Sequence, residues 1–145
     1  NKLDALSRGS IIYGNASAAT TVLTKGGADT VLTSDGTDIS WQAISGGTSW
    51  QAVITAATKT AVAGEGYFIN TTSNPCTVTL PAGTLGNEVS LVDYAGTFDT
   101  NNLTVAPNGS EKIQGVAASL TVSIERAGLT LVYTDATQGW LLKDK

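Results

Sequence analysis

The sequence predicts an all-β protein, and three observations lead to that prediction. Only 14% of its 145 residues are charged, where about 25% is typical of globular domains. Threonine is the commonest residue, and its branched Cβ suits an extended, half-exposed strand. Apolar residues recur in short runs, often alternating with polar ones, and show no helical period of roughly 3.6 residues. We therefore expect short strands joined by turns along the whole chain.

The first part of the chain, residues 1–47, is rich in Gly, Ser, Thr and Ala and predicts only weak strands. Turns at Lys25–Gly27 and Asp35-Gly36 separate them. A ribbon of two or three such strands is marginal alone in water, and ordering it costs about 1–2 kcal/mol of backbone entropy per residue. The predicted strands are 10–14 (SIIYG), 20–24 (TTVLT), 29–34 (DTVLTS) and 38–42 (DISWQ).

Two explanations of this segment are open: it is disordered, or neighbouring copies of the chain order it. The paired aliphatic residues Ile11-Ile12, Val22-Leu23 and Val31-Leu32, with Trp41, favour order, because disordered tails usually lack such residues. A thin apolar interior shared by several chains around an axis would accommodate them. The residues that we expect at this interface are Ile12, Tyr13, Leu23, Leu32, Trp41 and Trp50.

From Trp50 onward, short strands recur every 8 to 15 residues or so, which is the rhythm of a sandwich or barrel. The Gly46-Gly47 pair is the candidate boundary. We therefore predict a fibre shaft or oligomerisation segment at 1–47 and a small antiparallel, jelly-roll-like β-sandwich head at 48–145. The predicted strands are 50–55, 65–72, 76–82, 88–94, 103–108, 119–125, 129–135 and 139–144.

Individual positions follow from this pattern. Cys76 alternates with Val78 and Leu80, so we expect a buried thiol rather than a ligand or nucleophile. Trp140 follows a glycine in the last strand and is expected in the core or at its edge. Trp41 and Trp50 flank the glycine pair, and we expect them to pack where shaft meets head.

Composition excludes several function classes. The chain has no His and one Cys, so the usual general base, nucleophilic pairs and zinc clusters are absent. A net charge of −4 with scattered basic residues argues against nucleic acid. The sequence has no apolar run of about 18 residues, so we expect no membrane span. We expect no enzyme activity, no cofactor and no metal.

Two pairs of carboxylates are candidates for catalysis, because a pair of acidic side chains can cleave polysaccharides. Asp35 with Asp38, and Asp93 with Asp99, are the candidate pairs, and solvated turn carboxylates are the simpler interpretation. We expect Asp93 or Asp99 to order the loop YAGTFDTNN by binding backbone N–H groups. That loop also carries candidate receptor-binding residues, aromatic rings and amides suited to sugars, although the two rings could instead fill the domain edge or an inter-subunit seam. These candidates are Tyr94, Phe98, Asn101 and Asn102.

Longer stretches carry a family resemblance. The segment LSRGSIIYGNASAATTVLTKGGADTVLTSDGTDISWQ resembles one in bacteriophage tail-fibre and related virion appendage proteins, through Gly9–Gly14, Leu23–Gly26 and Val31–Trp41. The stretches YFINTTSNPCTVTLPAGTLGNEVSLVDYAGTFDTNNLTVAPNGSEKIQG and LTLVYTDATQGWLL are similar to C-terminal sandwich modules of such fibres.

The resemblance implies a parallel homotrimer in the virion, made in the bacterial host cytoplasm and contributing to attachment to host surface polysaccharide or protein. Two alternatives are a purely structural fibre or decoration protein on the capsid or neck, and a carbohydrate-binding module of a depolymerase. The sequence begins at Asn1 rather than Met, so we expect a fragment or processed product, with a preceding part that contacts other virion proteins.

Overall fold

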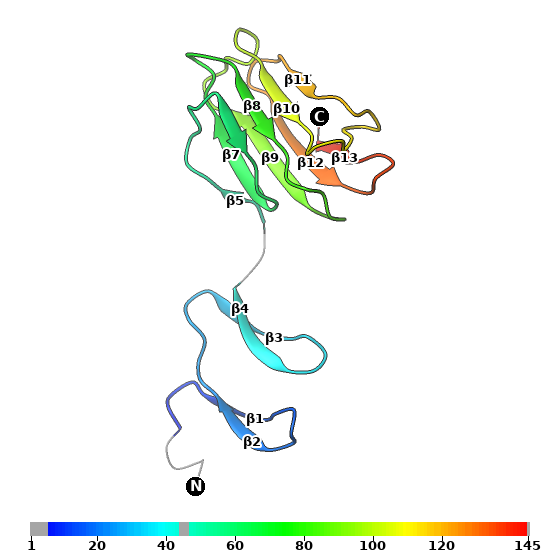
Figure 1. Ribbon diagram of the computed structural model, residues 1–145. Coiled ribbons are helices and arrows are strands. Elements are labelled where there is room, and N and C mark those ends of the chain that lie inside the picture. The colour runs from blue at the N-terminus through cyan, green and yellow to red at the C-terminus, as the bar shows by residue number, and fades with distance from the viewer. Residues whose placement is uncertain (1–5, 44–46, 145) are drawn as a thin grey trace. The chain divides into compact units, whose positions relative to one another are not determined.

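The computed structural model describes residues 6–43 and 47–144 (Figure 1). Every regular element in these two ranges is a β-strand, which confirms the predicted all-β class. The strands are β1 (Ile11–Gly14), β2 (Thr20–Leu23), β3 (Thr30–Ser34), β4 (Ile39–Ala43), β5 (Ser49–Trp50), β6 (Thr58–Thr60), β7 (Glu65–Ile69), β8 (Cys76–Thr79), β9 (Glu88–Asp93), β10 (Leu103–Ala106), β11 (Leu120–Val122), β12 (Gly128–Tyr133) and β13 (Trp140–Asp144).

The chain forms two compact units, unit 1 (Asn1–Gly46) and unit 2 (Gly47–Lys145). Gly46 lies outside the described residues, so the glycine pair is seen only through Gly47, whose φ of 89° falls in the left-handed region. Each unit has its own sheets.

Unit 1 consists of two antiparallel hairpins, β1-β2 and β3-β4. All four strands fall where the sequence predicts them. Their turns are held by side chains that accept backbone N–H bonds: Asn15 Oδ1 from Ser17 and Ala19, and Asp35 Oδ1 from Thr37 and Asp38. These polar turn residues, rather than a core, set the local fold of each hairpin.

Unit 2 is a two-layer sandwich with the sheet orders β11-β10-β8-β6 and β13-β12-β9-β7-β5 (Figure 1). Strands β5, β7 and β9 pair in parallel in one sheet, and β6, β8 and β10 pair in parallel in the other. The chain therefore alternates between the sheets, coiling through three rungs: β5-β6, β7-β8 and β9-β10. Antiparallel β11, β12 and β13 complete the sheets.

This topology corrects the predicted antiparallel, jelly-roll-like sandwich. Alternation of apolar and polar residues fixes which side chains face inward, but it carries no information on strand direction. A connection that crosses to the opposite sheet and a hairpin that returns beside its own strand have the same sequence pattern when every strand is short.

Most strands of unit 2 also lie where they are predicted, with two differences at the first rung. Predicted strand 50–55 is reduced to β5 and an isolated bridge between Ile54 and Ile69. Strand β6 was not predicted, because Thr58 and Thr60 flank Lys59, which does not resemble a core position. The half-buried Lys59 places its Nζ 5.0 Å from the centre of the Tyr67 ring, a cation–π contact.

The core of unit 2 lies between its two sheets. Cys76 is buried there as predicted, and burial raises the pKa of its thiol, which makes it unreactive. Trp140 is 0% exposed and forms an edge contact with Tyr133, confirming its predicted core position. The buried apolar residues are Ala61, Tyr67, Ile69, Cys76, Val78, Leu80, Val89, Leu91, Phe98, Leu103, Val105, Ile113, Leu129, Leu131 and Trp140.

Candidate interaction surfaces

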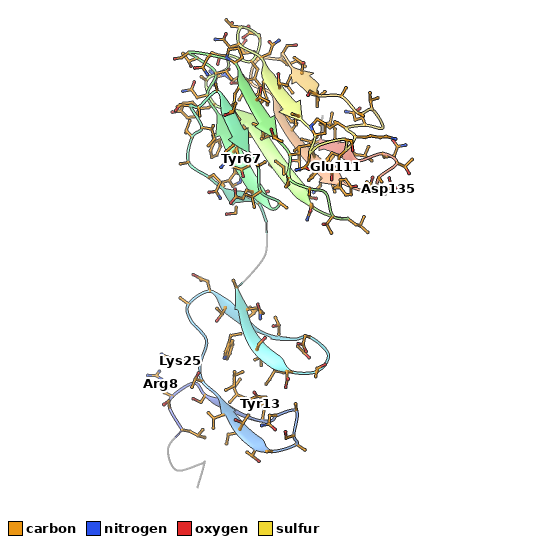
Figure 2. The ribbon with its side chains drawn as sticks, in the orientation of Figure 1. Arg8, Tyr13, Lys25, Tyr67, Glu111 and Asp135 are labelled. Atoms are coloured by element: carbon orange, nitrogen blue, oxygen red, sulfur yellow. The ribbon has the colours of Figure 1, made fainter. Side chains whose placement is uncertain are left out.

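Unit 1 presents its apolar side chains without burying them. None of its described residues, 6–43, is buried. In the first hairpin Ile12 pairs with Val22 on one face, while Ile11, Tyr13 and Leu23 share the other face. Figure 2 labels Tyr13 on this hairpin. An isolated two-stranded hairpin is marginally stable at best in water, so contacts that cover either apolar face would stabilise this one.

The second hairpin carries most of its apolar residues on one face. Leu32 is directly opposite Trp41, and Ile39 lies on the same face. Leu32 is 43% exposed and Val31, on the other face, is 42% exposed. The structure thus brings Leu32 and Trp41 of the expected interface together, and places Ile12 on the opposite face of the first hairpin from Tyr13 and Leu23. The trimer itself stays a prediction.

Trp41 has a defined place within unit 1. Its Nε1–H donates to the carbonyl of Thr24 at 2.7 Å, across 17 residues of sequence. Its ring covers Gly26, where a Cβ would stand 2.8 Å from the indole and 2.3 Å from Thr30 Oγ1. Two elements of the resemblance, the Leu-x-x-Gly segment (Leu23–Gly26) and Trp41, therefore pack against each other. Gly26 has no side chain, which leaves space for the indole.

In unit 2, the loop after β9 is organised by Asp93. This carboxylate is 4% exposed and accepts N–H bonds from Gly96, Thr97, Phe98 and Arg126. Burial raises the pKa of Asp93, but the four backbone donors outweigh it, and the net pKa is lowered. The prediction that Asp93 orders this loop is confirmed, and the carboxylate has no free lone pair for catalysis.

The same loop reduces the predicted receptor surface. Phe98 is 0% exposed in the core, so it does not present its ring to a sugar; Asp93 draws the loop inward and Phe98 with it. Asn101 is half-buried and uses its Nδ2 on the carbonyls of Thr71 and Thr72. The candidates that remain accessible are Tyr94, 53% exposed, and the half-buried Asn102.

Trp50 forms the exposed aromatic corner of unit 2. It is 48% exposed and stacks on Phe68, with ring centres 4.7 Å apart. Gly66 lies beneath the indole, since a Cβ there would stand 2.7 Å from it. Trp41 and Trp50 were predicted to pack at the junction; the contacts described for each lie within its own unit.

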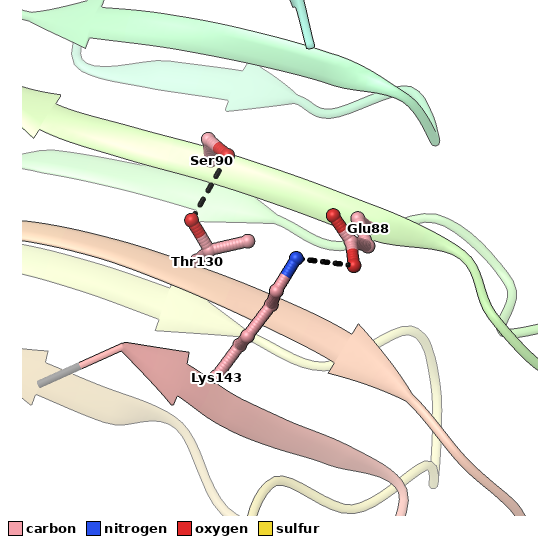
Figure 3. Close-up of polar contacts among 4 residues, drawn as sticks. All are labelled: Glu88, Ser90, Thr130 and Lys143. Carbon is pink, nitrogen blue, oxygen red and sulfur yellow. Dashed lines mark hydrogen bonds and ion pairs between the residues drawn. The ribbon is translucent and has the colours of Figure 1, made fainter. Parts of the chain in front are cut away.

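A polar depression of about 500 Å³ lies near the N-terminal ends of β5, β7 and β9. Lys143 Nζ donates to Glu88 Oε1 at 3.0 Å, and Ser90 bonds Thr130 at 3.1 Å (Figure 3). Glu65 accepts the Tyr67 hydroxyl, and burial, with Glu65, raises the Tyr67 pKa to about 12. Its lining residues are Gly47, Thr48, Ala63, Gly64, Glu65, Gly86, Asn87, Glu88, Ser90 and Lys143.

No sequence pattern predicts this depression, because its residues come from strands that are far apart along the chain. Glu88 and Lys143, for example, are separated by 55 positions. Glu88 and Lys143 form an ion pair and Glu65 accepts the Tyr67 hydroxyl, so each charged group that lines the depression already has a partner within the chain.

The predicted carboxylate pairs have structural places. Asp35 caps its turn, and the backbone bonds from Asp38 and Thr37 lower its pKa. Asp99 accepts from the neighbouring Thr100 hydroxyl. Over 6–43 and 47–144, no three His, Cys, Asp or Glu side chains cluster as metal ligands would. The same residues include no helix of the length and hydrophobicity needed to cross a membrane.

The model of the bacteriophage T4 gp9/10-like protein, N-terminal family matches residues 11–140, which includes strands of both units. The chain belongs to this family. The baseplate wedge protein gp10 of Enterobacteria phage T4 is 30% identical to it over 91 residues.

That match covers 61% of this chain and only 15% of the baseplate wedge protein, so the chain corresponds to a small part of its relative's length. The relatives of this chain are structural proteins of a bacteriophage tail and baseplate, which supports the predicted class of bacteriophage structural proteins. The family match does not specify a tail fibre.

Proposed function

We propose that this gp9/10-like chain is a non-enzymatic structural segment of a bacteriophage tail or baseplate, assembled as a parallel homotrimer in the virion. Unit 1 is the oligomerisation segment and unit 2 is the folded head. The observation that carries the proposal is that none of the described residues of unit 1 is buried, although its hairpins hold apolar residues on both faces. Three copies around one axis would cover those faces and close the assembly.

The family favours a tail location over the capsid or neck. The relative's name places that protein in a baseplate wedge, and we propose that this chain likewise contacts other virion proteins. The uncharged strands of unit 1 are suited to a buried position among other virion proteins, since no charge would need to be desolvated there.

A contribution to host attachment is the finer part of the proposal, and it falls to unit 2. Tyr94 offers an exposed ring at the loop that Asp93 fixes, which is a suitable geometry for stacking on a sugar face. Adsorption of virions to host cells tests it: Tyr94→Ala should reduce adsorption while leaving assembly unchanged, and equal adsorption would remove attachment from the proposal.

Light scattering of the intact chain tests the assembly. A mass three times the chain's 14.8 kDa is expected. A mass of one chain at every protein concentration would overturn the proposal, because no second copy would then cover the apolar faces of unit 1.

A further inference from the structure

The first rung of unit 2, residues 47–62, leaves the edge of both sheets open. Strand β5 ends the five-stranded sheet and β6 ends the four-stranded one. We propose that this edge is the site where a strand from unit 1 of a second copy pairs. The inference rests on the proposed homo-oligomer and names the surface at which copies of the chain meet.

The backbone of the rung is directed for such pairing. The amides of Ser49 and Gln51 donate to the carbonyls of Gly64 and Gly66 in the second rung. In a parallel ladder, alternate residues point their backbone groups the other way, so Trp50, paired with Gly66, directs its amide and carbonyl outward. An extended segment can bond to those groups by strand addition.

The edge lacks the charges that usually guard an open strand. Residues 47–58 contain no Asp, Glu, Lys or Arg, whereas natural edges commonly carry such residues to prevent pairing. Lys59 lies in β6 and turns over the Tyr67 ring, so the part of the edge that carries no charge is β5. The opposite ends of the sheets differ: β13 carries Lys143 and Asp144, and β11 is followed by Glu125 and Arg126.

Apolar side chains flank the open backbone. Trp50 is 48%, Val53 38% and Val62 53% exposed. Trp50 is held in place by its stack on Phe68 and by the space over Gly66, so a partner would meet a preorganised ring at little entropic cost. Because β5 and β6 have only 2 and 3 residues, the site suits one short strand and not runaway association.

A second copy is the occupant that these features select. A short, uncharged strand with apolar side chains would complement this edge. The four strands of unit 1 contain no charged residue. Those strands form two separate two-stranded sheets and so have open edges of their own. Unit 1 thereby gains burial that its own described residues do not provide.

The test places one charge at the edge of the full-length chain. Val53→Lys is the main variant and Val62→Lys the second, since both side chains are exposed and neither substitution removes a core contact. Leu85→Lys and Val116→Lys are the controls, because Leu85 (78% exposed) and Val116 (61% exposed) are apolar positions away from the rung. Near-UV circular dichroism checks that each variant is folded, and light scattering over a dilution series gives the association constant.

Both rung variants should weaken association by about tenfold or more, because pairing would bury an unpaired ammonium, while the controls stay near wild type. If the wild type associates and all four variants match it, the edge is not the interface, although the proposed oligomer stands. If the wild type is a monomer at every concentration, both the edge and the oligomer are wrong.

Discussion

Unit 1 and unit 2 are built from similar short strands, but among the described residues only unit 2 buries side chains in a core. Both are built from strands of two to six residues rich in Thr, Val, Leu and Ile. Unit 2 stacks two sheets and buries a contiguous cluster that includes Tyr67, Phe98 and Trp140 at 0% exposure. Unit 1 pairs its strands just as regularly but has no buried residue in the part described. Strand pairing alone therefore does not give a core.

The difference shows where each unit's stability comes from. Burying one Val, Leu, Ile or Phe side chain contributes about 1.5–3 kcal/mol, and unit 2 collects this many times within one chain. No described side chain of unit 1 is fully buried, so under the proposed assembly most of this stabilisation would come from contacts between chains. We therefore expect perturbations of unit 2 to be independent of protein concentration and perturbations of unit 1 to depend on it.

The largest expected effect is on the core of unit 2. Trp140→Ala removes a fully buried ring and its bond from Nε1 to Glu111, and should lower the free energy of unfolding by about 3–5 kcal/mol. Urea denaturation at two protein concentrations measures it. The loss should be the same at both, whereas the cost of Trp41→Ala, the matched change in unit 1, should fall once dilution dissociates the wild-type assembly. If the losses of the two variants depend on protein concentration in the same way, the proposed difference between unit 1 and unit 2 is wrong.

Asp93→Asn should be the next largest, at about 2–4 kcal/mol, because the amide replaces a charged acceptor of four backbone bonds. The folded pKa of Asp93 is lowered, so its stabilisation is present above the unfolded pKa of about 3.9 and is lost as pH falls through the folded pKa. Urea unfolding from neutral to acid pH should show the gap between wild type and variant closing. A gap independent of pH would contradict this account of the loop.

Gly26→Ala tests the contact that orders unit 1. The new methyl would press on Thr30 Oγ1 and the Trp41 ring, and overpacking of this kind costs about 1–3 kcal/mol. Thermal melting followed by Trp fluorescence should show a lower, concentration-dependent first transition. Gly27→Ala is the control, since nothing lies within 4 Å of its Cβ position; equal effects would mean that the Trp41 contact is unimportant.

The smallest effect is expected for Lys143→Gln. The pair with Glu88 raises the pKa of Lys143, but both side chains are largely exposed, at 52% and 39%, and surface ion pairs contribute little. The melting temperature should stay within error of wild type. A clear drop would indicate that the outer face of the five-stranded sheet is buried in the assembly.

The sequence predicts the side-chain pattern better than the topology. Alternation correctly places Cys76, Val78 and Leu80 on one buried face, and turn chemistry correctly assigns Asp35 and Asp93. Parallel pairing could not be predicted, because strand direction depends on which sheet each connection crosses to. Strand β6 could not be predicted, because Lys59 occupies one of its inward positions. That position depends on contact with the Tyr67 ring of the neighbouring rung.

The candidate contact residues divide along the same line. Tyr94 stays exposed while Phe98 is buried only four residues later, because Asp93 turns the loop back into unit 2 through bonds to Gly96, Thr97 and Phe98. Loop composition identifies residues capable of binding, but the fold decides which of them reach solvent.

Hydrogen exchange at two protein concentrations tests the central claim most directly. At high concentration, amides of β1 to β4 in unit 1 and of β7 to β10 in unit 2 should all be protected. On dilution below the association midpoint, the unit 1 amides should exchange freely while those of unit 2 keep their protection. Undiminished protection of unit 1 in a sample that light scattering shows to be monomeric would contradict the account.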